Sequence, residues 1–70
     1  MMKFSDVRRA VALIHQSQKR DSLPLPDFFS LLCIQLGTEG EETEEALSMA
    51  LDEEYIRMDY HGEPTVAFNI

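Results

Sequence analysis

The first twenty residues alternate apolar and polar positions with the period of an α-helix. One stripe at spacings of three and four, flanked by Phe4 and Leu13, consists of Val7, Ala10, Val11, Ile14 and Gln18. Such spacing places the side chains on one helical face. Ser5 precedes the stripe as a candidate N-cap, with Asp6 in the first turn. The pattern predicts an amphipathic helix over residues 6–19, with its outer face carrying Arg8, Arg9, Lys19 and Arg20.

A second helix is predicted between two prolines and a glycine. Pro24 and Pro26 impose extended backbone before it, so residues 23–25 favour a short edge-strand contact. Pro26 suits the first helical position, and Gly37 suits a left-handed C-cap. The expected inner face consists of Phe28, Phe29, Leu32, Cys33 and Leu36. The expected outer face includes Leu31 and Ile34.

The third predicted helix runs to about Glu53. Thr38 and Glu41 have the spacing of a capping box, although Gly40 weakens the first turn and allows a later start at Glu41 or Thr43. The expected inner face consists of Ala46, Leu47, Ala50 and Leu51. The expected outer face consists of Glu41, Glu42, Glu44, Glu45, Ser48, Met49, Asp52 and Glu53.

The remaining residues alternate with a period of two, which is typical of strands. Ile56, Met58 and Tyr60 share one face of a first strand, and residues 61–64 form a turn. The apolar positions of a second strand are Val66, Phe68 and Ile70. The pattern predicts a hairpin that packs against the helices.

This order of elements resembles a winged helix-turn-helix domain over nearly the whole chain. Leu32-Cys33-Ile34-Gln35-Leu36-Gly37 is similar to the end of the family's second helix, and Leu47 and Leu51 match two leucines of its third helix. Residues 55–64 resemble the first wing strand and the wing tip. Glu54 stands where many members have glycine. The resemblance implies one α+β domain over residues 1–70, with three helices and a C-terminal β-hairpin wing, that binds DNA, RNA or protein.

Charge divides the chain into two unequal parts. The 70 residues have a net charge of −7. Residues 1–20 contain five Lys or Arg and one Asp, a net charge of +4, whereas residues 21–70 contain one Arg and twelve acids, a net charge of −11. An acidic surface of this kind argues against general binding to phosphate backbones.

The acidic third helix is the main departure from DNA-reading members of the family. Those members present basic or amide side chains to the major groove, whereas this outer face carries six carboxylates. Three interpretations remain: a solvated face that maintains solubility, a docking surface for another protein with a basic surface, and a mimic of DNA phosphates that inhibits a nucleic-acid-binding protein. The docking residues expected here are Glu41, Glu44, Glu45, Met49 and Asp52.

Two further surfaces have more than one interpretation. Leu31 and Ile34 either pack within the domain or form a patch for a homodimer or a partner. The cations Arg8, Arg9, Lys19, Arg20 and Arg57 either remain solvated, contact phosphate, or contact the acidic helix of a second copy. Contact with phosphate keeps a DNA-binding regulator, acting through the first helix and the wing, as an alternative.

Candidate chemistry is sparse. His15 and His61 are single histidines without a second ligand at metal-binding spacing, and Cys33 is the only cysteine. No apolar run approaches the roughly 20 residues of a membrane span. We therefore expect a cytoplasmic, non-enzymatic interaction module without cofactor or metal, associated with transcription or with a mobile element.

Overall fold

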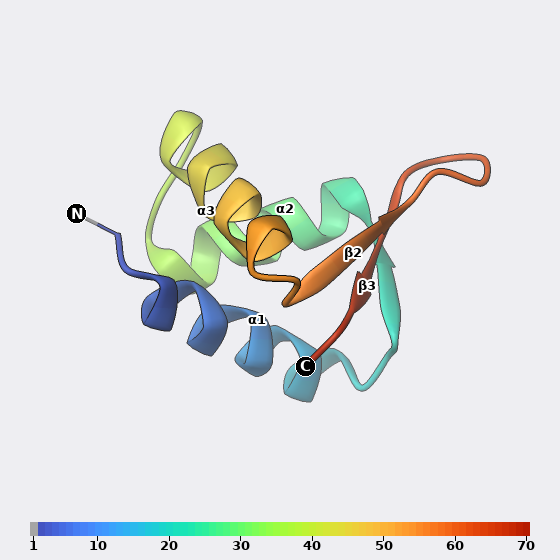
Figure 1. Cartoon of the computed structure of the whole chain (residues 1–70), viewed down its shortest axis with the longest axis horizontal. Coiled ribbons are helices and arrows are strands. Elements are labelled where there is room, and N and C mark those ends of the chain that lie inside the picture. The colour runs from blue at the N-terminus through green and yellow to red at the C-terminus, as the bar shows by residue number, and fades with distance from the viewer. Residues whose placement is uncertain (1) are drawn as a thin grey trace.

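The structure is a computed structural model that describes residues 2–70. The elements are α1 (Phe4–Gln18), β1 (Ser22–Pro24), α2 (Leu25–Leu36), α3 (Glu41–Asp52), β2 (Ile56–Asp59) and β3 (Thr65–Phe68). The three strands form an antiparallel sheet in the order β1-β3-β2. The expected α+β class is confirmed, and the arrangement has the layout of a winged helix, with β2 and β3 as the wing (Figure 1).

Helix α1 buries the predicted stripe but begins earlier than expected. Its N-cap is Lys3, which has no side-chain cap, so the prediction that Ser5 caps this helix was wrong. The amides of Asp6 and Val7 donate to the Lys3 carbonyl, at 3.1 and 3.2 Å. These backbone bonds extend the helix toward the N-terminus and place Ser5 inside it. Lys19 ends the helix in the left-handed region, at φ 53°.

Strand β1 fixes the hairpin to the helices. Leu23 pairs with Val66 of the central strand β3, and both side chains are buried. Pro24 is tolerated because β1 lies at an edge of the sheet, where a missing amide breaks no ladder. The expected edge-strand contact at residues 23–25 is confirmed over Ser22–Pro24.

Helix α2 begins one residue before Pro26 and ends as predicted. Gly37 adopts φ 65° and its amide bonds the Cys33 carbonyl, which is the geometry of a left-handed C-cap. Phe28 and Leu32 are fully buried, whereas Phe29, Cys33 and Leu36 are half-buried. The predicted inner face of α2 is therefore confirmed, and its most deeply buried residues are Phe28 and Leu32.

Helix α3 begins at Glu41, after Gly40, and the expected capping box is absent. Gly40, at φ 59° and ψ −126°, takes the N-cap position, so Thr38 stands two residues before the cap. The Thr38 hydroxyl instead lies 2.8 Å from the Thr43 hydroxyl, which lies 3.2 Å from the Cys33 sulfur. Thr43 is fully buried, and these contacts satisfy its hydroxyl group.

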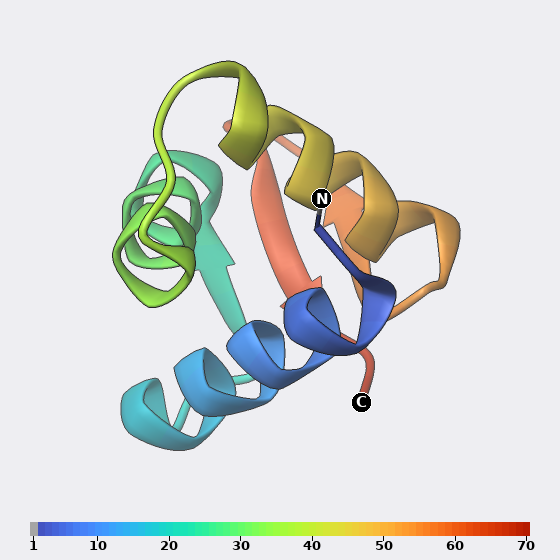
Figure 2. The same ribbon diagram turned by 90° about the vertical axis from the view of Figure 1, so that its left-hand side faces the viewer.

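The core lies between the three helices and one face of the sheet (Figure 2). Its aromatic centre is Phe28, which meets Phe68 edge-on with ring centroids 5.9 Å apart. Phe68 also stacks on His15 at 4.8 Å. The other buried apolar residues are Val7, Ala10, Val11, Ile14, Leu23, Leu32, Ala46, Ala50, Ile56 and Val66.

Candidate functional site

The outward face of α3 is a surface of carboxylates. Thr43, Ala46 and Ala50 face the core at helical spacing, which directs the acidic side chains away from it. The exposed acids of this face are Glu41, Glu42, Glu44, Glu45, Asp52 and Glu53. Acids near the first turn also favour the helix itself, because they lie at the positive end of its dipole. We call Glu41, Glu44, Glu45 and Asp52 the acidic face.

Met49 does not belong to this exposed surface. It is half-buried and packs against the core, so its assignment to the centre of the outer face was wrong. Its neighbours on the helix, Ala46 and Ala50, have small side chains. A long flexible thioether covers such a position readily. The acidic face therefore lacks the apolar centre that the sequence indicated.

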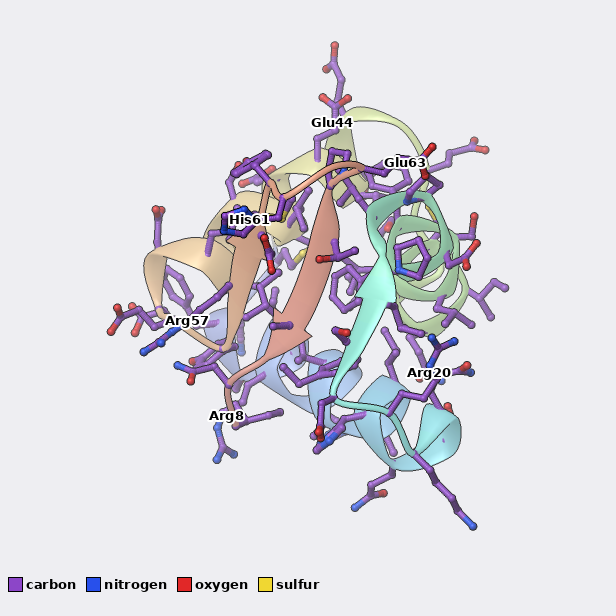
Figure 3. All side chains as sticks on the ribbon, turned by 90° about the vertical axis from the view of Figure 1, so that its right-hand side faces the viewer. Arg8, Arg20, Glu44, Arg57, His61 and Glu63 are labelled. Carbon is purple, nitrogen blue, oxygen red and sulfur yellow. The ribbon has the colours of Figure 1, made fainter. Side chains whose placement is uncertain are left out.

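The wing tip carries further acidic side chains, Asp59 and Glu63. In Figure 3, Glu44 and Glu63 lie toward the same edge of the view, but Figure 1 places the start of α3 and the wing tip toward opposite ends of the long axis. The tip turns at Gly62, at φ 84°, and the His61 amide donates to the Asp59 carboxylate at 2.9 Å. The two elements with which a winged helix usually approaches DNA thus both present carboxylates here.

The predicted cations do not form one continuous surface. Arg8 and Arg20 lie at the opposite end from Glu44, on different sides of the molecule (Figure 3). Arg57 lies on the outer side of the hairpin, in a hollow of about 570 Å³ that it shares with Tyr60 and His61. Arg9 faces two acids of α3 across another hollow. Lys19 is exposed at the end of α1.

Leu31 and Ile34 are not equivalent. Ile34 is 74% exposed, as expected, whereas Leu31 is half-buried and packs against the core. Leu31 lines a hollow of about 300 Å³ together with Leu23 of β1 and Gln18 of α1. The close approach of α1 and β1 to this side of α2 covers Leu31. The two-residue patch expected from the sequence is reduced to Ile34.

We expect this difference to appear as a difference in stability. Leu31→Asp should lower the free energy of unfolding by more than 1 kcal/mol, since a charge would enter a half-buried apolar site. Ile34→Asp should change it by less than about 0.5 kcal/mol. Urea denaturation followed by circular dichroism measures both. Equal losses in the two variants would show that the side chains are equally buried.

The histidine and cysteine side chains that could take part in chemistry make packing contacts instead. His15 stacks on Phe68, and Cys33 contacts Thr43. Within residues 2–70, no group of three or more His, Cys, Asp or Glu side chains is placed to hold a metal ion. No helix in that range is long and apolar enough to cross a membrane.

One feature beside the acidic face was not predicted from the sequence. A hollow between α1, α2 and α3 is lined by Leu13, Leu36, Glu42 and Glu45, among others. Its acidic lining could have been predicted from the spacing, because Glu42 and Glu45 are three residues apart and lie on one side of the helix. Glu41, Glu44 and Asp52 do not line it.

The chain therefore has a winged-helix layout in which the third helix and the wing tip present carboxylates. Comparison with protein-family models, with curated proteins and with solved structures found no match.

Proposed function

We propose that this chain is a non-enzymatic protein-interaction module that binds a partner with a basic surface through Glu41, Glu44, Glu45 and Asp52. The observation that carries the proposal is the exposure of these carboxylates on the face that a winged helix usually turns toward DNA. An accessory role in transcription or in a mobile element, in the cytoplasm and without a cofactor, is part of the proposal.

Electrostatics favours a cationic partner over nucleic acid. Each exposed ion pair contributes about 0.2–1 kcal/mol, so four carboxylates contribute at most a few kcal/mol in total. Their larger effect is on association, because a surface of one sign attracts its opposite and repels its like. The proposal therefore requires additional apolar contacts for high affinity.

Two alternatives make different demands on the same surfaces. A DNA-binding regulator would use the basic residues of α1 together with the wing, but α1 and the wing tip lie at opposite ends of the molecule (Figure 1). A DNA mimic would use the acidic face, with a nucleic-acid-binding protein as its partner. The mimic is an inhibitor and the regulator binds DNA itself, so the two alternatives belong to different functional classes from the proposed module.

Titration with duplex DNA tests the proposal against the regulator. We expect no saturation up to about 100 µM protein at about 50 mM salt, because like charges face each other at the third helix. Fluorescence anisotropy of a labelled duplex measures the binding. Saturable binding that weakens steeply between about 50 and 200 mM salt would overturn the proposal.

A further inference from the structure

The hollow beside the acidic face combines apolar and acidic side chains from all three helices. Its volume is about 710 Å³. Leu13 of α1 is 42% exposed at its wall, and Leu36 of α2 is half-buried there. Ala10 of α1 is buried and contributes no side chain beyond its Cβ. An apolar side chain from another molecule could therefore lie against Leu13 and Leu36.

The charges around this hollow are predominantly negative. Among residues 2–70, Glu42 and Glu45 line it from α3, Asp6 lines it from α1, and Arg9 is the one Lys or Arg in the lining. All four of these side chains are exposed. The resulting net charge of −2 at the hollow is opposite to that of a Lys- or Arg-rich segment, and Glu45 joins the hollow to the acidic face.

We propose that this hollow receives a basic amphipathic helix of the partner protein. An apolar side chain of that helix packs against Leu13 and Leu36, and flanking Lys or Arg side chains reach Glu42 and Glu45. This is the helix-in-groove mode, in which apolar anchors supply affinity and the charged rim supplies selection. The inference rests on the proposed function and adds the apolar anchor that the acidic face lacks.

A synthetic peptide tests this binding mode directly. The probe is a helical peptide of about 16 residues with Leu on one face and Lys on the other, which is long enough to be partly helical. Two control peptides replace its Leu residues with Gln, or its Lys residues with Glu. Amide chemical shifts of the labelled chain, recorded during titration, report the affinity and the binding site. We expect the Leu/Lys peptide to shift the amides of Leu13, Leu36, Glu42 and Glu45, and the Leu/Gln exchange to weaken binding about tenfold or more.

Variants of the hollow separate its apolar and charged parts. Leu13→Asn should weaken binding of the Leu/Lys peptide about tenfold, and thermal melting verifies that this half-exposed position tolerates it. Glu42→Gln should weaken binding about two- to fivefold, with Glu54→Gln as the matched control outside both the hollow and the acidic face. Arg9→Gln should strengthen binding about two- to fivefold, with Arg8→Gln as its control. A gain of affinity in Arg9→Gln cannot result from misfolding.

The outcomes distinguish this inference from the proposed function. Shifts confined to Glu41, Glu44 and Asp52, with equal affinity for the Lys peptides that carry Leu or Gln, would overturn the hollow as a binding site and leave the acidic face as the interface. The absence of binding by either Lys peptide would also overturn the hollow. Concentration-dependent shifts of the same amides without peptide, with a doubled mass in sedimentation, would overturn it in favour of a second copy.

Discussion

Replacing Phe28 with alanine should leave the chain largely unfolded at 25 °C. Phe28 is fully buried and meets Phe68 at 5.9 Å, so its removal opens a cavity at the centre of the core. Phe→Ala substitutions in cores cost about 3–5 kcal/mol. A single core in a domain of this size supplies about the same amount. Far-ultraviolet circular dichroism should show the loss of helix.

The neighbouring phenylalanine provides the matched control. Phe29 is half-buried on the same helix, so Phe29→Ala should reduce the unfolding midpoint but retain the folded state at 25 °C. Phe4→Ala, at a position 45% exposed, should have the smallest effect of the three. A Phe28→Ala variant that melts close to the wild-type temperature would place the core elsewhere.

Reversing the charge of α3 should create DNA binding that we do not expect of the natural chain. The variant carries Glu41→Lys, Glu44→Lys and Glu45→Lys, which places three cations on the face that a winged helix turns toward the duplex. We expect a dissociation constant of about 1–100 µM at about 50 mM salt, as in non-specific binding. The affinity should fall about tenfold or more by about 200 mM salt, because two or three phosphates are neutralised.

A second triple variant controls for total charge. Asp21→Lys, Asp27→Lys and Glu54→Lys changes three exposed acids away from the acidic face. Each substitution adds two charges to the natural −7, so both variants have a net charge of −1. We expect the control to bind duplex DNA at least tenfold more weakly than the α3 variant. Equal affinities would show that net charge, rather than the face of α3, determines binding.

Local patterns predicted most elements because they depend on few neighbours. The α1 stripe, the Gly37 cap and the alternating strand residues each follow from backbone or side-chain geometry within about ten residues. The edge strand followed from Pro24 and Pro26, since prolines restrict the backbone to extended forms and exclude a central strand. These parts of the fold were predictable from the sequence.

The burial and contacts of several side chains depend on tertiary packing, which the hydrophobic pattern does not describe. Thr38 had the spacing of a capping residue, but its hydroxyl contacts that of Thr43 instead. Thr43 is buried and also contacts Cys33 of α2. The helical pattern placed Met49 and Leu31 on outer faces, whereas both are half-buried and pack against the core. A wheel describes one helix alone and contains no information about these neighbours.

Glu54 stands where many winged-helix domains have glycine, and its backbone conformation shows how this chain makes the same turn. It adopts φ 59°, in the left-handed region that glycine occupies at low cost. Its carbonyl accepts a hydrogen bond from the Asn69 side chain at 2.7 Å. The same turn is therefore made here by a non-glycine residue, so the absence of glycine at position 54 did not exclude the corner.

The negative charge of the candidate site was predicted from the sequence, but the shape of the site was not. The concentration of acids in residues 41–53 was evident from the sequence. The division of those acids between an outward face and a hollow with Leu13 was not, because it depends on how α1 and α2 pack against α3. The binding mode of this region therefore required the structure.

Quantitative capture of partners from a host extract tests the acidic face most directly. The wild type is compared with Glu41→Gln/Glu44→Gln/Glu45→Gln and with a control, Asp21→Asn/Glu54→Gln/Glu63→Gln, which loses the same number of charges. We predict at least one basic protein that the wild type and the control retain equally and that the first variant loses by about tenfold or more. Identical protein profiles for all three baits would contradict the assignment of α3 as a docking surface.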